Sequence, residues 1–522
     1  MSASYDNQIK RQKQKESLAE SKLRTLRAEQ TYRALDNDHN KRKRRTPSIE
    51  FRGEDEQLGQ FNRLKSIAKA RDTRRNFAGA KATETQLWLN AIGTCPKIIV
   101  HFPDGDERKK EWSDWFNGPY AKRCDGIGDR HLGDQARIAF SSMVREGDIL
   151  CYFDSAGVIP NAAGSLWYWE ADQMPSIAPK DFGKNSKEIA GKLGYSGKIK
   201  QHHGIVTDEW GRAIGYIVTK DKALRGKATV KYSETTILPA ASCKLLYNPW
   251  RINQRRGTSD YLEIANVWQD LERFSESLIQ RSILQSYMAI KIKREGGAIA
   301  GRDNAFDSED AAGVPTVESD NVANGTSYRN YEKLSMNAIE YMEEGEDAEA
   351  MQLSGDLPDA EQLIDFLQGG SGWAQGLSAM YATGKADASY SASMAESNMT
   401  WALFEWWQKK IERDYFDWVA EHSFRWAVKA SRISAANEAD WLDNYSWHNW
   451  PKRRAINPAQ EANARKTDLE IAAIDYEDIH GPYWPDKLEN LGTQIKWSRD
   501  HGLFVPLFQP QPSTGGQDNG DE

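Results

Sequence analysis

The residues of this chain that could bind a nucleotide phosphate stand in two glycine-containing segments. Gly296 and Gly301 have the spacing of a phosphate-binding loop, but Arg302-Asp303 follows where such a loop needs Lys and then Ser or Thr. Gly384-Lys385 lacks both the upstream glycine and the hydroxyl that would hold magnesium. The sequence therefore predicts no nucleotide-hydrolysing loop of this kind.

Metal-ligating and nucleophilic side chains are also scattered. His202-His203 has no third ligand at metal-binding spacing, and neither an HExxH nor a GxSxG motif is present. The four cysteines form no CxxC pair and lie far apart, at Cys95, Cys124, Cys151 and Cys243. We therefore expect reduced thiols, no metal, no cofactor and no catalytic activity.

Charge divides the chain into two parts. Residues 1–46 carry 13 Lys or Arg against 6 Asp or Glu, which leaves 56 basic and 70 acidic residues for 47–522. Gripping duplex DNA requires positive charge that neutralises phosphates, so an acidic body suits a surface past which DNA slides. No apolar run is long enough for a membrane span, and no secretory signal is evident.

The elements that must position these residues are mostly helices. Apolar spacing of three to four predicts helices over 57–92, 130–145, 260–289, 359–368, 394–428, 458–474 and 484–500. Strand patterns cover 147–153, 166–169, 214–218 and 338–342, with turn residues at 208–212. The fold class is therefore α+β, predominantly helical. A helix of the length of 260–289 with one narrow apolar stripe favours lateral packing against neighbouring helices.

Several short motifs, taken in order, resemble the lambda-type phage portal proteins from about residue 60 to 500. Each motif is short, and their order and spacing make the resemblance specific. The motifs are Arg71-Asp72 with Arg75-Asn76, Val144-Arg145-Glu146-Gly147-Asp148, Trp169-Glu170-Ala171-Asp172-Gln173, 204–212 (GIVTDEWGR), 254–259 (QRRGTS), 390–393 (YSAS) and 457–461 (NPAQE).

The resemblance implies a portal fold with wing, stem, clip and crown, assembled as a ring that usually has twelve subunits. The implied parts are the first part of the wing (47–257), a stem helix (258–290), the clip (291–357), a second stem helix (358–377), a tunnel loop (378–393), a long wing helix (394–428) and the crown (429–504). Outside the resemblance, charge and composition predict a basic arm (1–46) and a disordered tail (505–522).

The same resemblance implies a channel for DNA packaging and ejection at one capsid vertex of a virion, assembled in the bacterial host cytoplasm. Its partners would be double-stranded DNA, the terminase large subunit, the major capsid protein and scaffold, and head-completion or tail adaptor proteins. The tunnel loop would offer the channel Thr383, Gly384, Lys385, Ser389, Tyr390 and Ser391. The clip would present Glu343, Glu344, Glu346 and Asp347 to the terminase or adaptors.

Two other classes stay open at this point. The 19 tryptophans and many carboxylates would suit a carbohydrate-active enzyme, although large core and interface side chains are the more common use of Trp. The basic arm, which ends in the run 41–45, would suit a nucleic-acid-binding structural protein.

Overall fold

The computed structural model of the protein describes residues 58–102, 107–157, 163–220, 225–286, 290–294, 346–350, 360–385, 389–453, 463, 466–467 and 484–501. The chain divides into two units, Met1–Pro451 and Lys452–Glu522. The described part of the second unit contains the helix α17 (Trp484–Asp500), as predicted. None of the described helices is long and apolar enough to cross a membrane.

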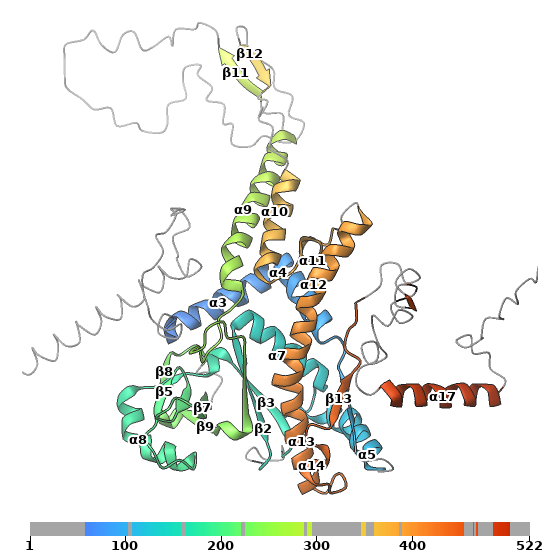
Figure 1. Ribbon diagram of the computed structural model, residues 1–522. Coiled ribbons are helices and arrows are strands. Elements are labelled where there is room, and N and C mark those ends of the chain that lie inside the picture. Colours follow the sequence, from blue (N-terminus) through green and yellow to red (C-terminus); the bar gives the residue numbers. More distant parts are fainter. Residues whose placement is uncertain are drawn as a thin grey trace, which may run out of the picture. The chain divides into compact units, whose positions relative to one another are not determined.

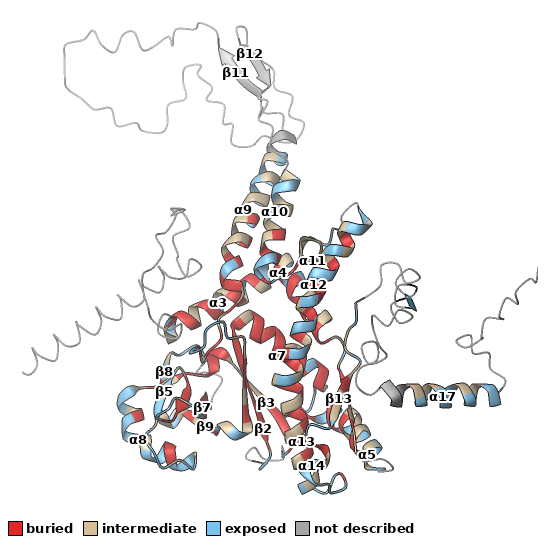
Figure 2. Cartoon of the chain, in the orientation of Figure 1, coloured by how far each residue is buried: buried red, intermediate tan, exposed pale blue. Residues whose placement is uncertain are grey.

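The centre of the first unit is a three-stranded antiparallel sheet in the order β10-β2-β3 (Figure 1). Its strands are β2 (Asp148–Asp154), β3 (Ser165–Glu170) and β10 (Cys243–Tyr247), and all seven residues of β2 are buried. The helix α7 (Leu132–Glu146) precedes β2 and packs on this sheet, so both appear red in Figure 2. The apolar run 149–153 thus lies in the middle strand of the sheet, between β10 and β3.

A second sheet has the strand order β5-β6-β7-β9. It contains β5 (Lys200–His202), β6 (Ile205–Thr207), β7 (Ala213–Thr219) and β9 (Thr235–Pro239), next to α8 (Pro179–Lys192). The predicted turn between β6 and β7 is present, because Asp208 and Arg212 pair across it and Gly211 has φ 91°. The remaining small elements are α5 (Arg108–Trp115), α6 (Ala121–Arg123), η3 (Ala171–Gln173), β4 (Ser176–Ile177), β8 (Thr229–Val230), η5 (Tyr232–Glu234), η6 (Ala240–Ser242) and α14 (Glu438–Trp441).

A two-stranded sheet joins segments far apart in the chain. Strand β1 (Lys97–Val100) pairs antiparallel with β13 (Tyr445–His448). Beside it, Trp112, Phe424 and Trp441 pack with ring centroids 5.0 and 5.4 Å from the Trp112 ring. Most of the core is one large hydrophobic cluster, and the buried tryptophans belong to it, so these side chains are used for packing.

The helix expected over 57–92 is interrupted. It forms α3 (Gln60–Asn76) and α4 (Ala78–Ala91), separated by Phe77 in an extended conformation. The Phe77 ring stacks on Trp268, with centroids 6.4 Å apart, and a Cβ added to Gly79 would lie 1.8 Å from the Trp268 ring. The break therefore makes room for the Trp268 indole, a contact that helical periodicity alone does not reveal.

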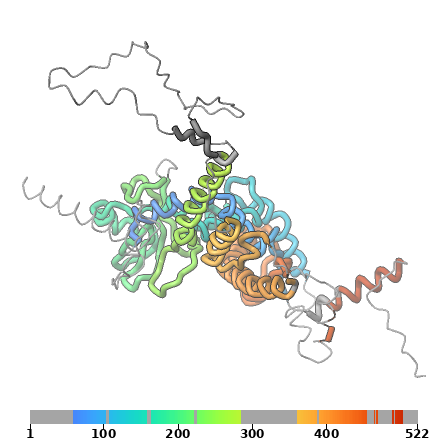
Figure 3. The backbone as a smooth tube through the Cα atoms, turned by 90° about the horizontal axis from the view of Figure 1, so that it is seen from above, coloured from blue at the N-terminus to red at the C-terminus, as the bar shows by residue number. Residues whose placement is uncertain are grey.

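Two long helices run side by side away from the sheets (Figure 1). They are α9 (Tyr261–Ser286) and α10 (Ala360–Ala374). Between these helices in the sequence come the strands β11 (Ile290–Arg294) and β12 (Glu346–Ala350), which pair antiparallel with each other. Seen from above, α9 lies between the green and the orange parts of the chain (Figure 3). The strand predicted at 338–342 and the helix predicted at 458–474 fall largely outside the described residues.

The long aromatic helix expected over 394–428 is present and begins earlier. It consists of α12 (Tyr390–Ile411), the π-helical turn η7 (Glu412–Phe416) and α13 (Asp417–Lys429), and a similar π-turn, η2 (Phe116–Tyr120), follows α5. Within η7 the buried Tyr415 hydroxyl lies 2.8 Å from that of Tyr168 on β3. The π-turn thus re-aims one side chain of a continuous helix toward the central sheet.

The helix predicted over 359–368 is too short, because the Gly-Gly-Ser-Gly run that was expected to end it is helical. A Cβ added to Gly372 would lie 2.3 Å from the Cβ of Ala382, and one added to Gly369 would lie 3.7 Å from the Cβ of Ala379. Both alanines belong to the short helix α11 (Ala379–Thr383). The glycines allow α11 to approach α10 closely, which compensates for their low helix propensity.

Candidate functional site

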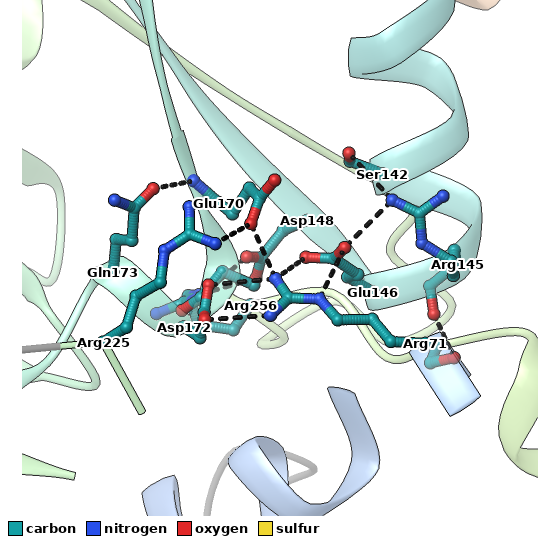
Figure 4. A network of polar contacts seen from close by, with 12 residues as sticks. Arg71, Ser142, Arg145, Glu146, Asp148, Glu170, Asp172, Gln173, Arg225 and Arg256 are labelled. Carbon is teal, nitrogen blue, oxygen red and sulfur yellow. Dashed lines mark hydrogen bonds and ion pairs between the residues drawn. The ribbon is translucent and has the colours of Figure 1, made fainter. Parts of the chain in front are cut away.

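A group of ion pairs, here called the ionic junction, joins the start of α9 to the central sheet (Figure 4). It consists of Arg71, Glu146, Asp148, Glu170, Asp172 and Arg256.

Arg71 on α3 occupies the middle of one half. Its Nη2 lies 2.8 Å from Oε2 of Glu146 and 2.8 Å from Oε2 of Glu170, and its Nη1 lies 2.9 Å from Oδ2 of Asp172. These carboxylates come from the end of α7, the end of β3 and the turn η3. One guanidinium therefore fixes α3 against three other elements.

Arg256 and Asp148 form the other half, and each side chain is 1% exposed. Arg256 donates from Nε to Oδ2 of Asp148 at 2.6 Å and from Nη2 to Oδ1 at 2.8 Å. The same Oδ2 accepts the backbone N–H of Gly257 at 3.0 Å. This bidentate pair attaches the segment that opens α9 to the first residue of β2.

Two glycines let the backbones meet at this point. Gly147 ends α7 with φ 98°, and a Cβ added to Gly257 would lie 1.7 Å from the Gly147 carbonyl oxygen. The Ser259 hydroxyl donates to the Arg145 carbonyl, and the Tyr261 N–H donates to the Ser259 hydroxyl at 3.1 Å. The first turn of α9 is thus held by backbone contact as well as by charge.

The junction and its neighbours are balanced in charge. Arg74 and Arg145 pair with Glu84, Arg145 also with Glu146, and Arg225 pairs with Glu170. Together with the junction these ion pairs include five arginines and five carboxylates. Burial lowers the pKa of Arg71, but its hydrogen bonds with Asp172 and Glu146 outweigh burial and raise it. Burial and the nearby Glu146 raise the pKa of Glu170.

The same carboxylates are the one group among the described residues with the spacing of a metal site. Ligand oxygens of Glu146, Glu170 and Asp172 lie within 4.8 Å of one another. The Arg71 guanidinium lies among them and bonds to all three. A cation is thus already supplied by the protein, so the cluster fits an arginine better than a metal ion.

The small-residue stretch 378–393, predicted as a flexible loop, is largely helical. Residues 379–383 form α11, and α12 already begins at Tyr390. From α12, the Glu396 carboxylate accepts the Met380 N–H and the Thr400 hydroxyl accepts the Ser378 N–H, both at 3.1 Å. The expectation of a free loop is therefore wrong for its described part, because side chains of α12 satisfy the first N–H groups of α11.

The predicted channel residues lie at the two ends of this segment. Thr383 ends α11 and its hydroxyl donates to the Ala379 carbonyl, while Gly384 follows with φ 73°. Ser389 precedes α12, and its hydroxyl lies 2.9 Å from that of Ser391. Tyr390 is the first residue of α12. The hydroxyls of Thr383, Ser389 and Ser391 are thus engaged in hydrogen bonds within the chain.

Lys385, predicted as a channel residue of the tunnel loop, is paired twice. Its Nζ lies 2.8 Å from Oε1 of Glu361 and 2.8 Å from Oδ2 of Asp365, both on α10. Hydrogen bonds to Asp365 and Glu361 raise the pKa of Lys385. The sequence reading missed these partners, although their i, i+4 spacing places them on one face of the predicted helix.

The predicted clip residues divide between described and undescribed parts. Glu343 and Glu344 lie outside the described residues. Glu346 and Asp347, expected in an acidic turn, belong instead to β12, where they stand opposite Arg294 and Lys293 of β11. The acidic residues are therefore in register with basic ones.

The ionic junction itself was not predicted as a site, although the sequence contained its signal. All six of its residues belong to the motifs quoted above. Those motifs, spread over nearly 200 residues of sequence, converge on one place in the fold (Figure 4). Their role is structural, because they supply the charges and glycines that join α3, α7, β2, β3, η3 and the start of α9.

Comparison with known proteins assigns the chain to a protein family. The model of the family described as "Phage portal protein, lambda family" matches residues 41–408. No curated protein matches the chain.

Among solved structures, the chain is similar to "Virion of native gene transfer agent (GTA) particle", with 12% identity and a TM-score of 0.43 over 80% of this chain and 96% of that one. It is also similar to "Neck of native GTA particle computed with C12 symmetry", with 10% identity and a TM-score of 0.42 over 80% and 95% of the two chains. The family match covers well over half of the sequence and confirms the resemblance carried by the motifs. The chain belongs to the lambda family of phage portal proteins.

Proposed function

We propose that this chain is the subunit of a ring whose central channel passes double-stranded DNA during packaging and ejection. In this proposal the ring occupies one capsid vertex and is a passive conduit, with a separate terminase supplying the energy. Twelve copies is the number that the family resemblance implies. The membership of the chain in a portal family supports this function.

The observation that carries the ring is an apolar stripe on α9 that is only half covered. Its lower part is buried, with Ile264 and Leu271 at 2% and 8% exposure. Beyond that point Ile279 is 58% and Ile283 46% exposed. The stripe thus continues past the region where the described residues of this chain bury it.

Helix α10 has the same feature. Phe366 is 63% and Trp373 58% exposed, and their rings make an edge-to-face contact with centroids 6.3 Å apart. Exposed apolar side chains gathered on one helix pair mark a protein–protein contact. Neighbouring copies of α9 and α10 in a ring would cover these faces.

The other parts follow the same proposal. The region 291–357, which contains β12 and nearly all of β11, would be the clip that contacts the terminase and later the adaptor proteins. The segment 378–393 would face the channel, residues 47–257 and 394–428 would form the wing, and 429–504 the crown inside the head.

Negative-stain images of the purified full-length protein test the ring. We expect closed rings with a central hole. Ile279→Asp should convert them to separate subunits with unchanged circular dichroism, because it places a carboxylate on the exposed stripe. Ser277→Asp is the matched control, since two residues turn an α-helix by about 200° and put the same charge on the opposite face. A monomer under all conditions, or equal ring yields from both variants, would contradict the proposal.

A further inference from the structure

Lys385 and its two partners form a compact charged group, here called the lysine triad. Lys385, Glu361 and Asp365 have side chains that are 53%, 80% and 35% exposed, so the triad is reachable from solvent. One ammonium and two carboxylates leave a net charge of −1. The segment 378–385 therefore presents an acidic group where the sequence alone suggested a single positive charge.

The backbone holds the triad together. Gly384, with φ 73°, ends α11 and turns the chain back, and its N–H donates to the Met380 carbonyl at 2.9 Å. The Lys385 N–H donates to the Thr383 hydroxyl at 3.2 Å. Because α11 packs closely on α10 through Gly372, the lysine that follows α11 is delivered to the two α10 carboxylates.

We propose that Glu361 and Asp365 mask Lys385 from the phosphates of duplex DNA, so that this segment repels passing DNA. The inference rests on the proposed channel function and specifies why the channel wall binds the passing DNA only weakly. A phosphate that approaches Lys385 must compete with two carboxylates already 2.8 Å away. It must also approach a group whose own charge is negative.

The masking does not depend on permanent contacts. Exposed ion pairs open and close readily, because water and salt screen them. The sum of charges stays at −1 whether or not a given hydrogen bond is formed at that moment. Repeated around a ring, the triads would form a band of negative charge, in place of the band of positive charge that unpaired lysines would create.

The triad allows a graded series of charges within one small site. Lys385→Ala gives −2 per subunit, the wild type −1, Asp365→Asn 0, and Glu361→Gln with Asp365→Asn +1. The affinity of purified rings for a blunt linear DNA duplex should rise along this series. The unmasked double variant should also show the steepest dependence on salt, since each lysine that neutralises a phosphate adds about 0.9 to the slope of log affinity against log salt.

The size of the effect follows from the number of contacts. If about three lysines of the double variant contact phosphates at once, the added affinity falls about 40-fold between about 50 and about 200 mM salt. Wild-type rings and Lys385→Ala rings should show no such additional salt-dependent affinity for DNA.

A second ion-paired group provides the matched control. Arg425 pairs with Glu438 at 2.9 Å and with Glu421 at 3.5 Å, so it too is one cation with two carboxylates. Glu421→Gln with Glu438→Gln changes the net charge of the subunit by the same amount as unmasking the triad. If the effect belongs to the triad, this control should bind DNA as the wild type does.

A second measurement follows Lys385 directly. In rings of the double variant, acylation of the Lys385 amine, read by mass spectrometry, should become faster and should be slowed by added duplex. In wild-type rings, duplex should leave the rate unchanged.

Equal DNA affinities and salt slopes for wild type, the double variant and the Arg425 control would overturn the masking, while rings in the micrographs would leave the proposed function standing. Absence of rings would instead overturn the proposed function itself.

Discussion

Replacing Asp148 by Asn tests whether the ionic junction holds the base of α9. The substitution preserves the shape of the side chain but removes its charge and turns one accepting oxygen into a donating amide. Asp148 receives three hydrogen bonds, two from Arg256 and one from the Gly257 N–H, and both ionic side chains are 1% exposed. After the change a buried guanidinium faces an amide donor and has lost its counter-charge.

The expected loss is about 3–5 kcal/mol in the free energy of unfolding, the usual cost of breaking a buried ion pair from one side. The bonds give a similar value, because two weakened or lost bonds to a charged group cost ~1.5–3 kcal/mol each. Urea unfolding followed by tryptophan fluorescence and by circular dichroism measures the loss. The midpoint of the unfolding transition of the first unit, which contains the junction, should move to a lower urea concentration.

Asp208→Asn is the matched comparison for this change. Asp208 accepts from the N–H and Nε of Arg212 at 2.7 and 3.0 Å; its own side chain is 2% exposed, but the Arg212 side chain is 81% exposed. After the change water can solvate the Arg212 guanidinium, whereas Arg256 at the junction stays buried, so the effect of Asp208→Asn should be smaller. A loss of less than ~1 kcal/mol for Asp148→Asn, or equal losses for the two variants, would refute the view that the junction is a stabilising connection.

The other predictions concern neighbouring features. Gly372→Ala should destabilise the protein by about 1–3 kcal/mol because the new Cβ meets Ala382 at 2.3 Å, whereas Gly370→Ala, with open space around it, should stabilise it by up to ~1 kcal/mol; thermal unfolding of the two variants compares them. Arg71→Ala should lower stability by about 2–3 kcal/mol, discounted for its partial exposure, and calcium should then raise the unfolding midpoint of the variant alone, because three carboxylates with metal-site spacing lose the one cation that they share. Burial, with Glu263 nearby, raises the pKa of Asp260 to about 7. The folded protein therefore binds this proton more tightly than the unfolded chain, and the contribution to stability present below about pH 4 should be lost as the pH rises toward 7. Asp260→Asn should flatten that part of the pH profile of unfolding; an unchanged profile would contradict the assignment.

Periodicity and motif order determined much of the architecture. The helices α7 and α9 and the strands β2, β3 and β7 lie close to where apolar spacing predicts them, because each buries one face or a continuous run against the core. The motifs identified the family because they contain the charges and glycines of the ionic junction. These features depend on residues close together in the sequence, or on residues such as Gly257 that a close backbone contact requires.

Where local sequence signals and packing disagree, only the tertiary structure determined the outcome. The glycines after 368 read as a helix end, yet they are helical because α11 lies against them. Phe77 interrupts a good helical pattern because the Trp268 indole needs the space. Lys385 is the one cation of its segment in the sequence, yet two carboxylates of α10, 24 and 20 residues earlier in the chain, reverse the charge of its surroundings. Such outcomes depend on contacts between distant segments, and a periodic pattern in one segment contains no information about which segment will lie against it.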